Sequence, residues 1–130
     1  MIIRQFEDKD YDLIKGWWDA AKEVPPTLDS IPETSYIMLL KDEPILSVSL
    51  YLTNGKIAWV DNYIGSPSSK GSARKECGLI LLKHLEDVAK KHSKDRLFCM
   101  SMNEKTSQRY IEMGFIKTLS NVSTFIKGVE

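Results

Sequence analysis

The sequence predicts one α/β domain, an α+β arrangement in which a mixed, mostly antiparallel sheet carries helices packed on it. Three observations predict this class. Runs with strand character and runs with helical spacing both occur along the 130 residues. Three strand runs follow one another through short turns, which favours antiparallel pairing, and the last of them leads through a loop into a long amphipathic stretch. We therefore expect a single domain over residues 1–130 with about six to seven strands and three to four helices.

The chain opens with a strand followed by a helix. Residues 1–6 form a short run of apolar and polar side chains that suits a first strand. Asp8 or Asp10 can cap the helix that follows, because a carboxylate accepts from the free amides of a first turn. The apolar positions of this helix recur at helical spacing: Tyr11, Ile14, Trp17, Trp18 and Ala21. At least one of the two tryptophans is expected in the core.

Residues 23–35 contain three prolines and no sustained period, so a loop is expected there. Such a loop can line a substrate cleft or serve as a plain connector, and the sequence does not decide between the two.

The next three strands form an antiparallel meander over residues 36–41, 45–53 and 56–64, which are rich in β-branched and aromatic residues. A turn at residues 42–44 joins the first two, because proline fixes one dihedral there. Asn54-Gly55 joins the last two and predicts a type I′ turn with positive φ at both residues.

The second half returns to alternating helices and strands. A small-residue loop at residues 65–71 precedes an amphipathic helix that runs from about Leu79 to His92. A strand at 96–102, a short helix at 106–113 ended by Gly114, and a final strand at 122–126 complete the chain.

Composition and charge exclude several classes of protein. Eighteen basic and eighteen acidic residues cancel, which disfavours nucleic-acid binding. The local basic residues are interleaved with acids, as on a solvated helix face: Lys83, Lys90, Lys91, Lys94 and Arg96. The two cysteines lack the spacing of a disulfide framework or a metal site, and no stretch approaches the roughly 18 apolar residues of a membrane span. We expect a cytoplasmic protein without metal or membrane partner.

Residues 103–115, NEKTSQRYIEMGF, resemble the second motif of the GNAT acetyltransferase superfamily. Asn103, Thr106, Tyr110 and the Gly114-Phe115 pair match its spacing, with threonine in place of the usual alanine. The resemblance implies the acyl-CoA N-acyltransferase fold, with Asn103 on the cofactor side and Tyr110 as the general acid that protonates the CoA thiolate. Taken alone, a tyrosine on a short helix is more often a half-buried packing residue.

Residues 58–67 resemble the fourth strand of the same family, and Asp61 occupies its acidic position. An aspartate within a strand is unusual, so Asp61 is exposed at an edge, paired with a cation, or functional. The resemblance implies that Asp61 is the base and that the backbone of Tyr63, Ile64 and Gly65 holds the pantetheine arm. Because a free aspartate is a weak base at neutral pH, this role calls for partial burial beside Trp59 or Tyr63.

The family binds the CoA pyrophosphate with an Arg/Gln-x-x-Gly-x-Gly/Ala pattern at a helix start, where free amides and the helix dipole attract an anion. Counted back from the predicted helix, this pattern falls on residues 73–78. The resemblance then implies a cofactor site formed by Arg74, Lys75, Cys77 and Gly78, with Lys70 as a further cation. Ala73 and Glu76 depart from the pattern. As a nucleophile Cys77 lacks a histidine to activate it, and a small core residue is the simpler interpretation.

The resemblance implies a transferase that moves an acetyl group from acetyl-CoA to a primary amine of a small molecule or a peptide, in a ternary complex and without a metal. The alternative is a catalytically inactive binding or regulatory protein that keeps the fold and has lost CoA affinity. A nucleobase-modifying relative is a third hypothesis, which the balanced charge disfavours. The acceptor and the choice between monomer and homodimer are left open.

Overall fold

The computed structural model describes residues 1–69, 71–101 and 103–129. The chain divides into two compact units, Met1–Met100 and Ser101–Glu130. In the described part of the chain, no helix is long and apolar enough to cross a membrane.

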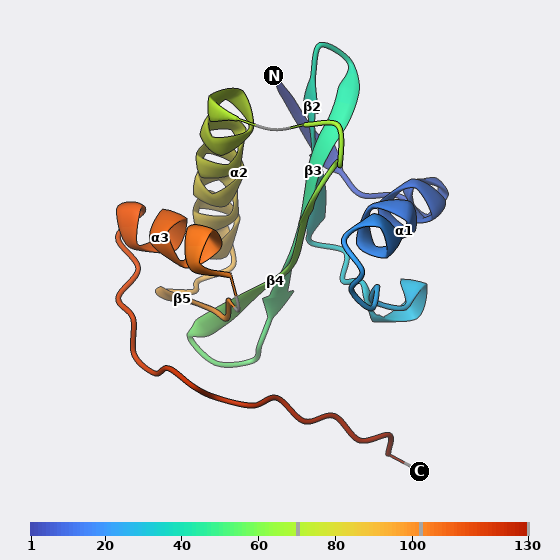
Figure 1. Cartoon of the computed structure of the whole chain (residues 1–130). Helices are drawn as coiled ribbons and strands as arrows, with labels where there is room; N and C mark the ends of the chain where they lie inside the picture. The colour runs from blue at the N-terminus through green and yellow to red at the C-terminus, as the bar shows by residue number, and fades with distance from the viewer. Residues whose placement is uncertain (70, 102, 130) are drawn as a thin grey trace. The chain divides into compact units, whose positions relative to one another are not determined.

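The first unit is built on a five-stranded sheet whose strand order follows the sequence (Figure 1). Its strands are β1 (Ile2–Gln5), β2 (Ser35–Leu40), β3 (Glu43–Leu52), β4 (Ile57–Gly65) and β5 (Arg96–Cys99). Neighbouring strands are antiparallel except β4 and β5, which are parallel. The mixed, mostly antiparallel sheet is confirmed, with fewer strands than predicted.

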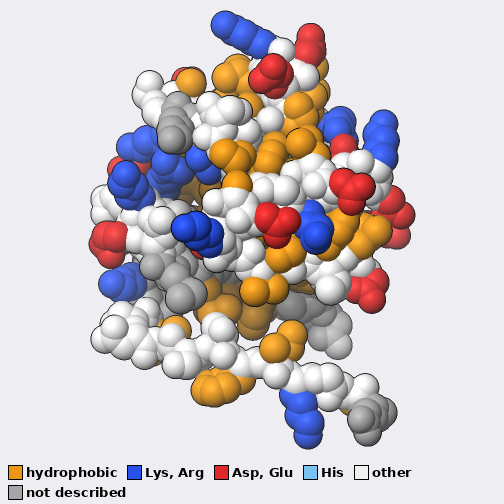
Figure 2. All heavy atoms as spheres, turned by 45° about the vertical axis from the view of Figure 1, so that its right-hand side comes forward, with side chains coloured by type: hydrophobic (Ala, Val, Ile, Leu, Met, Phe, Trp, Pro, Cys, Tyr) orange, Lys and Arg blue, Asp and Glu red, His pale blue; other side chains and the backbone are white. Residues whose placement is uncertain are grey.

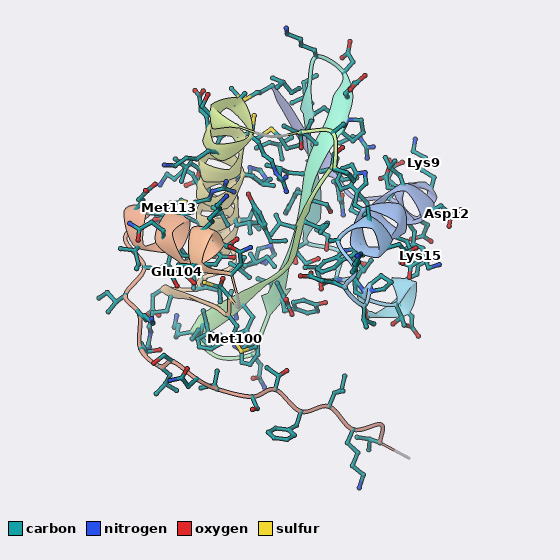
Figure 3. The ribbon with its side chains drawn as sticks, in the orientation of Figure 1. Lys9, Asp12, Lys15, Met100, Glu104 and Met113 are labelled. Carbon is teal, nitrogen blue, oxygen red and sulfur yellow. The ribbon has the colours of Figure 1, made fainter. Side chains whose placement is uncertain are left out.

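One face of the sheet is covered by α1 (Tyr11–Ala20), which follows the short 3-10 turn η1 (Asp8–Asp10). Ile14 and Trp17 of α1 pack in a core cluster with Ile37 of β2 and Ile64 of β4, so the core tryptophan is Trp17. Asp12 and Lys15 of α1, and Lys9 of η1, point away from the sheet (Figure 3).

Asp10 is the N-cap residue of α1, but its carboxylate does not cap the helix. It accepts two hydrogen bonds from the Arg4 guanidinium, at 2.8 and 2.7 Å, and one from the Glu7 amide at 2.8 Å. These bonds tie β1 to the start of α1. The hydrogen bond from Arg4 holds the pKa of the Asp10 carboxyl below its ordinary value, against the opposing effect of burial.

The other face carries α2 (Ser72–Lys91), on the side of the sheet opposite to α1 (Figure 1). Its buried residues face the sheet: Cys77, Gly78, Leu81, Leu82, Leu85, Val88 and Ala89. On its outer side Lys83 pairs with Glu86 and Asp87, and Lys90 pairs with Glu86. The predicted solvated helix face is confirmed for Lys83, Lys90 and Lys91, which are exposed, whereas Lys94 and Arg96 lie beyond the helix and Lys94 is partly buried. Both signs of charge occur across the surface in Figure 2.

The hairpin turns differ from the prediction. Among the described residues, neither Asn54 nor Gly55 has positive φ, so the predicted type I′ turn is wrong there. The Thr53 hydroxyl instead accepts from the Gly55 amide, and Lys94 donates to the Gly55 carbonyl at 2.6 Å, which stabilises a wider loop. Positive φ at two consecutive residues occurs at Lys41 and Asp42, between β2 and β3.

The second unit contains α3 (Glu104–Glu112). The predicted strand at 122–126 is wrong: residues 115–129 have no regular secondary structure. Val122, Phe125 and Ile126 are exposed. Strand propensity alone does not form a strand, because the ladder needs a partner for its hydrogen bonds. The predicted strand at 96–102 ends at Cys99, and Met102 lies outside the described residues.

Candidate active site

The site begins with a bulge in β4. Ser49 of β3 pairs with Asp61, and Ser47 pairs with Ile64, so Asn62 and Tyr63 together oppose one residue of β3. Asn62 has φ +55°, in the left-handed region that asparagine tolerates better than most residues. The strand therefore bends at the position where the sequence places the candidate base.

Hydrogen bonds of the Asn62 amide hold the bulge. Its Nδ2 donates to the Tyr51 hydroxyl at 2.8 Å and to Ser49 Oγ at 3.2 Å. Ser49 Oγ also accepts from Ser35 Oγ at 2.8 Å, and both serines are buried. Burial raises the pKa of the Tyr51 phenol, the hydrogen bond from Asn62 opposes this, and the charge of Asp61 adds to it.

The loop between α1 and β2 is connected to the same network. It contains the 3-10 turn η2 (Leu28–Ser30), and the Tyr51 hydroxyl donates to the Ser30 carbonyl at 3.0 Å. The loop also lines a surface hollow of about 660 Å³, whose walls are Asp8, Thr27, Leu28, Asp29 and Ile31. Tyr51 therefore joins this loop to the bulge.

Beyond the bulge, β4 separates from β5. The parallel pairing runs only from Ile57, opposite Arg96, to Val60, opposite Cys99. The strand itself continues to Gly65, paired on its other side with β3. Within the described residues, the backbone from Asp61 to Gly65 therefore has one edge that β5 does not pair. Tyr63, Ile64 and Gly65 lie in this stretch, as the resemblance implied.

Asp61 is exposed, so the expectation of its partial burial is wrong. Its Oδ1 accepts from the Asn62 amide at 2.8 Å. Asp61 lies two residues after Trp59 and opposite Ser49, so all three belong to the face of the sheet that α1 covers elsewhere.

The N-terminus of α2 lies earlier in the chain than predicted. Its N-cap is Gly71, with φ +85°, and the Lys75 amide makes the first helical hydrogen bond, to the Gly71 carbonyl at 3.2 Å. The amides of residues 72–74 precede that bond, as the free donors of a helix start do. Its first turn contains no acidic residue.

This shift moves the pyrophosphate pattern. On the observed helix start, Arg/Gln-x-x-Gly-x-Gly/Ala falls on residues 68–73, with Gly71 at the first glycine, Ala73 at the last small position and Ser68 at the basic position. Cys77 and Gly78 lie inside the helix and are buried. Their amides are part of the helix and are not at its start, so the predicted placement of these two residues is corrected.

Arg74 connects the start of α2 to the end of β4. Its guanidinium lies over Gly65, where a β-carbon would overlap Nη2. Nη1 donates to the Ser69 carbonyl at 3.0 Å, and Nε is buried without a partner among the described residues. Lys75 is exposed beside it, and Lys70 lies outside the described residues. The edge of β4 that β5 does not pair, the amides at the start of α2 and the Arg74 guanidinium thus lie close together.

Gly78 has a packing role. A β-carbon there would overlap the Tyr63 hydroxyl and come within 3.9 Å of Leu46 Cδ1. The glycine lets α2 lie close to the tyrosine of β4. Cys77 beside it is buried and free, and burial followed by the charge of Glu76 raises the pKa of its thiol. Both facts fit a small core residue, the simpler of the two interpretations of Cys77.

In the second unit, the GNAT-like motif is a helix with both ends capped. Oδ1 of Asn103 accepts from the amides of Lys105 and Thr106, at 2.8 and 3.4 Å. At the other end Gly114 has φ +94°, its amide donates to the Ile111 carbonyl, and the Phe115 amide donates to the Tyr110 carbonyl. This is the Schellman arrangement of a helix C-terminus.

Tyr110 is buried, and its ring packs on Phe115 with centroids 5.3 Å apart. The motif spacing is therefore explained by α3 itself: the asparagine starts the helix, the glycine ends it, and the phenylalanine fixes one side of the tyrosine ring.

Three of these site residues were missed from the sequence. Gly71 could have been found by sliding the phosphate pattern five residues toward the N-terminus. Asn62 and Tyr51 give no local signal, because their partners come from other strands.

Solved structures share this architecture. A Mycobacterium tuberculosis protein in complex with CoA superposes with a TM-score of 0.76 at 16% identity, over 95% of this chain and 76% of its own. A Trypanosoma brucei acetyltransferase superposes with a TM-score of 0.72 at 14% identity, over 96% of this chain and 99% of its own. The chain has the GNAT acetyltransferase fold.

N-Acetylglutamate synthase from Neisseria gonorrhoeae, solved with coenzyme A and N-acetyl-glutamate, also has a part with this GNAT fold. Its TM-score is 0.69 at 20% identity, over 85% of this chain and 27% of its own. No family model and no curated protein matches the sequence. Solved GNAT-fold proteins thus include acetyltransferases and proteins with CoA bound.

Proposed function

We propose that this protein is an acyl-CoA-dependent N-acyltransferase of the GNAT superfamily, which transfers an acetyl group from acetyl-CoA to a primary amine. One observation carries the proposal. After Val60, the edge of β4 that β5 does not pair in the described part of the chain runs to Gly65, directly against Arg74 in the first turn of α2. A thioester cosubstrate with a peptide-like arm and a pyrophosphate has the complementary groups in the same order.

The cofactor roles follow from these groups. The backbone of Tyr63, Ile64 and Gly65 pairs with the amides of the pantetheine arm, as an added strand would. The free amides at the start of α2 and the Arg74 guanidinium bind the pyrophosphate, with Lys75 adding positive charge. No acidic residue of the first turn opposes this.

The chemistry needs a neutral amine, because an alkylammonium has no lone pair. Asp61 accepts the proton of the ammonium, directly or through water, and a bound acceptor supplies the desolvation that the exposed carboxylate lacks. The amine nitrogen attacks the thioester carbon, and a backbone N–H near Ile64 stabilises the oxyanion. The C–S bond then breaks, and Tyr110 protonates the thiolate. The second proton of the nitrogen leaves as the amide forms and restores the tyrosine, directly or through water, while Asp61 gives the first proton to solvent.

Calorimetric titration with acetyl-CoA, followed by a thiol-release assay with a panel of primary amines, tests the proposal. We expect binding, and release of CoA that depends on an amine. Gly71→Ala should weaken binding about tenfold or more, because an L-residue is strained at φ +85° and the helix amides must move. Gly16→Ala in α1 is the matched control, since nothing lies within 4 Å of a β-carbon there.

A wild-type chain that does not bind acetyl-CoA would refute the proposal. Tyr110→Phe should lower kcat by roughly 100-fold or more with little change in the KM for acetyl-CoA, as expected for loss of a general acid. An unchanged kcat would remove Tyr110 from the mechanism.

A GNAT-fold binding protein without catalysis is the second candidate, and the position of Arg74 favours it. The guanidinium occupies the space over Gly65, at the end of the strand edge that a pantetheine arm would use. Weak or absent binding of acetyl-CoA and no transfer to any amine, with Tyr110→Phe indistinguishable from wild type in every assay, would select this candidate.

A further inference from the structure

Three aromatic side chains form one row across the sheet. Tyr51 of β3 pairs with Trp59 of β4, and Trp59 pairs with Phe98 of β5. Residues paired directly across neighbouring strands have side chains on the same face. The rings of Trp59 and Phe98 touch, with centroids 4.9 Å apart and planes tilted by 45°.

The row lies on the α1 face of the sheet, because Tyr51 donates to the Ser30 carbonyl in the loop that follows α1. The core of that face, however, is built around Ile14, Trp17, Ile37 and Ile64, and does not include the row. Trp59 is 43% exposed. An exposed tryptophan is common by itself, but a row of three aromatics at one level of three strands is an extended apolar surface.

Charge at one end of the row indicates what it would bind. Asp61 shares the face of Trp59 and follows it by two residues, so the two positions are roughly 7 Å apart along the strand. The carboxylate is exposed, and its Oδ1 is oriented by the Asn62 amide. The same Asn62 donates to the hydroxyl of Tyr51, so the carboxylate and the row are held by one residue.

We infer that the row Tyr51–Trp59–Phe98 is the acceptor subsite, and that it takes a primary amine carrying an aromatic ring on a short alkyl linker. The ring of the acceptor stacks on Trp59, and its ammonium pairs with Asp61 before it gives up the proton. The inference rests on the proposed function for the identity of the reacting group. It adds the substrate class, which neither the motifs nor the fold gives.

Two primary amines of equal charge test this substrate class: 2-phenylethylamine, which carries an aromatic ring, and n-butylamine, which carries only an alkyl chain. Binding of each is measured by calorimetry, with and without bound CoA, so that the result does not require turnover. We expect 2-phenylethylamine to bind more tightly. Trp59→Ala should weaken its binding roughly three- to tenfold, the range of one aromatic stacking contact, and weaken n-butylamine by less.

Two further variants separate stacking from charge. Trp59→Phe keeps a ring and should retain most of the affinity for 2-phenylethylamine. Asp61→Asn should weaken both amines. Circular dichroism and thermal unfolding of each variant establish that it is folded, which an exposed position favours.

Equal binding of the two amines by the wild-type protein, or an equal loss of both in Trp59→Ala, would overturn the inference. Failure of the proposed function is a different result. In that case 2-phenylethylamine still binds on Trp59 with the expected preference, and no acetyl group is transferred to it.

Discussion

The contact between Gly78 and Tyr63 provides a sharp test of how α2 sits on β4. Gly78 lies within the helix, where alanine is favoured over glycine by about 1 kcal/mol. The added β-carbon would overlap the Tyr63 hydroxyl, and overpacking of this kind costs roughly 1–3 kcal/mol. We therefore expect Gly78→Ala to destabilise the protein by about 1 kcal/mol net, against the helix propensity.

Removing the hydroxyl should reverse the sign. In a Tyr63→Phe background, the nearest atom to the new β-carbon is the ring carbon that carried the hydroxyl, at 3.6 Å, which is an ordinary contact. Gly78→Ala should then stabilise the fold by about 1 kcal/mol, so the two changes are coupled by roughly 2 kcal/mol.

Urea unfolding of the wild type, the two single variants and the double variant measures this coupling, provided the m-value stays constant. Any other interaction of Tyr63 is lost in both arms of the cycle and cancels. Gly16→Ala should be stabilising in both backgrounds, because nothing lies near its β-carbon. Additive effects of Gly78→Ala and Tyr63→Phe would refute the packing argument and leave Gly78 available for a different role.

Three other predictions concern stability. Asp10→Asn should lower the free energy of unfolding by about 2 kcal/mol, because it loses the charge-assisted bonds from Arg4. Because the pKa of Asp10 is lower in the folded protein than in the unfolded chain, its ionised carboxylate stabilises the fold above pH 3.8, and this stabilisation is lost as the pH falls through the folded pKa. Urea titrations at several pH values should show this decrease in the free energy of unfolding, and Asp10→Asn should remove it. The His84 ring meets the Tyr36 ring edge-to-face, with centroids 4.6 Å apart, and burial lowers the pKa of its imidazole. Stability should therefore fall below about pH 6.5 as the unfolded chain takes up the proton, and a His84→Leu variant that keeps this pH dependence would contradict the assignment. Asn103→Ala should cost α3 about 1 kcal/mol through the lost cap, Asn103→Asp should restore most of it, and equal helicity of all three by circular dichroism would contradict the capping role.

Much of the fold was predictable because local periodicity determines it. The β-branched and aromatic runs of β2 to β4 predict strands, the helical spacing of Ile14 and Trp17 predicts the buried side of α1, and these elements agree with the structure. The first turns of α2 were missed because residues 72–76 contain no apolar residue larger than alanine to show a period. The strand at 122–126 was predicted from composition, yet a strand depends on a partner that composition does not supply.

The candidate site likewise has parts that the sequence predicts and parts that it does not. Asn103, Tyr110 and Gly114 belong to one helix, so their spacing along the chain reports their geometry, and the caps of α3 account for it. The position of the pyrophosphate pattern depends on where α2 begins. Because the predicted start of α2 was wrong, the predicted pattern lay five residues too far toward the C-terminus. The network around Asn62 could not be predicted, because Ser49, Tyr51 and Ser30 reach it only once β3, β4 and the loop after α1 have come together.

Asn62 links these separate features of β4. Its left-handed backbone produces the bulge, and a bulge both increases the local twist and ends regular pairing. The strand pairs with β5 up to Val60, two residues before Asn62, and among the described residues β5 does not pair the stretch from there to Gly65. An asparagine can adopt this backbone at low cost because its side chain is short and polar, and here its amide donates to two hydroxyl groups. A β-branched residue at this position would favour regular extended backbone, which would close the edge proposed for the pantetheine arm and move the backbone N–H that orients Asp61. It would also lack the side-chain amide that donates to Tyr51 and Ser49. The strand edge, the carboxylate and the aromatic row therefore all depend on one residue that adopts a conformation most residues avoid.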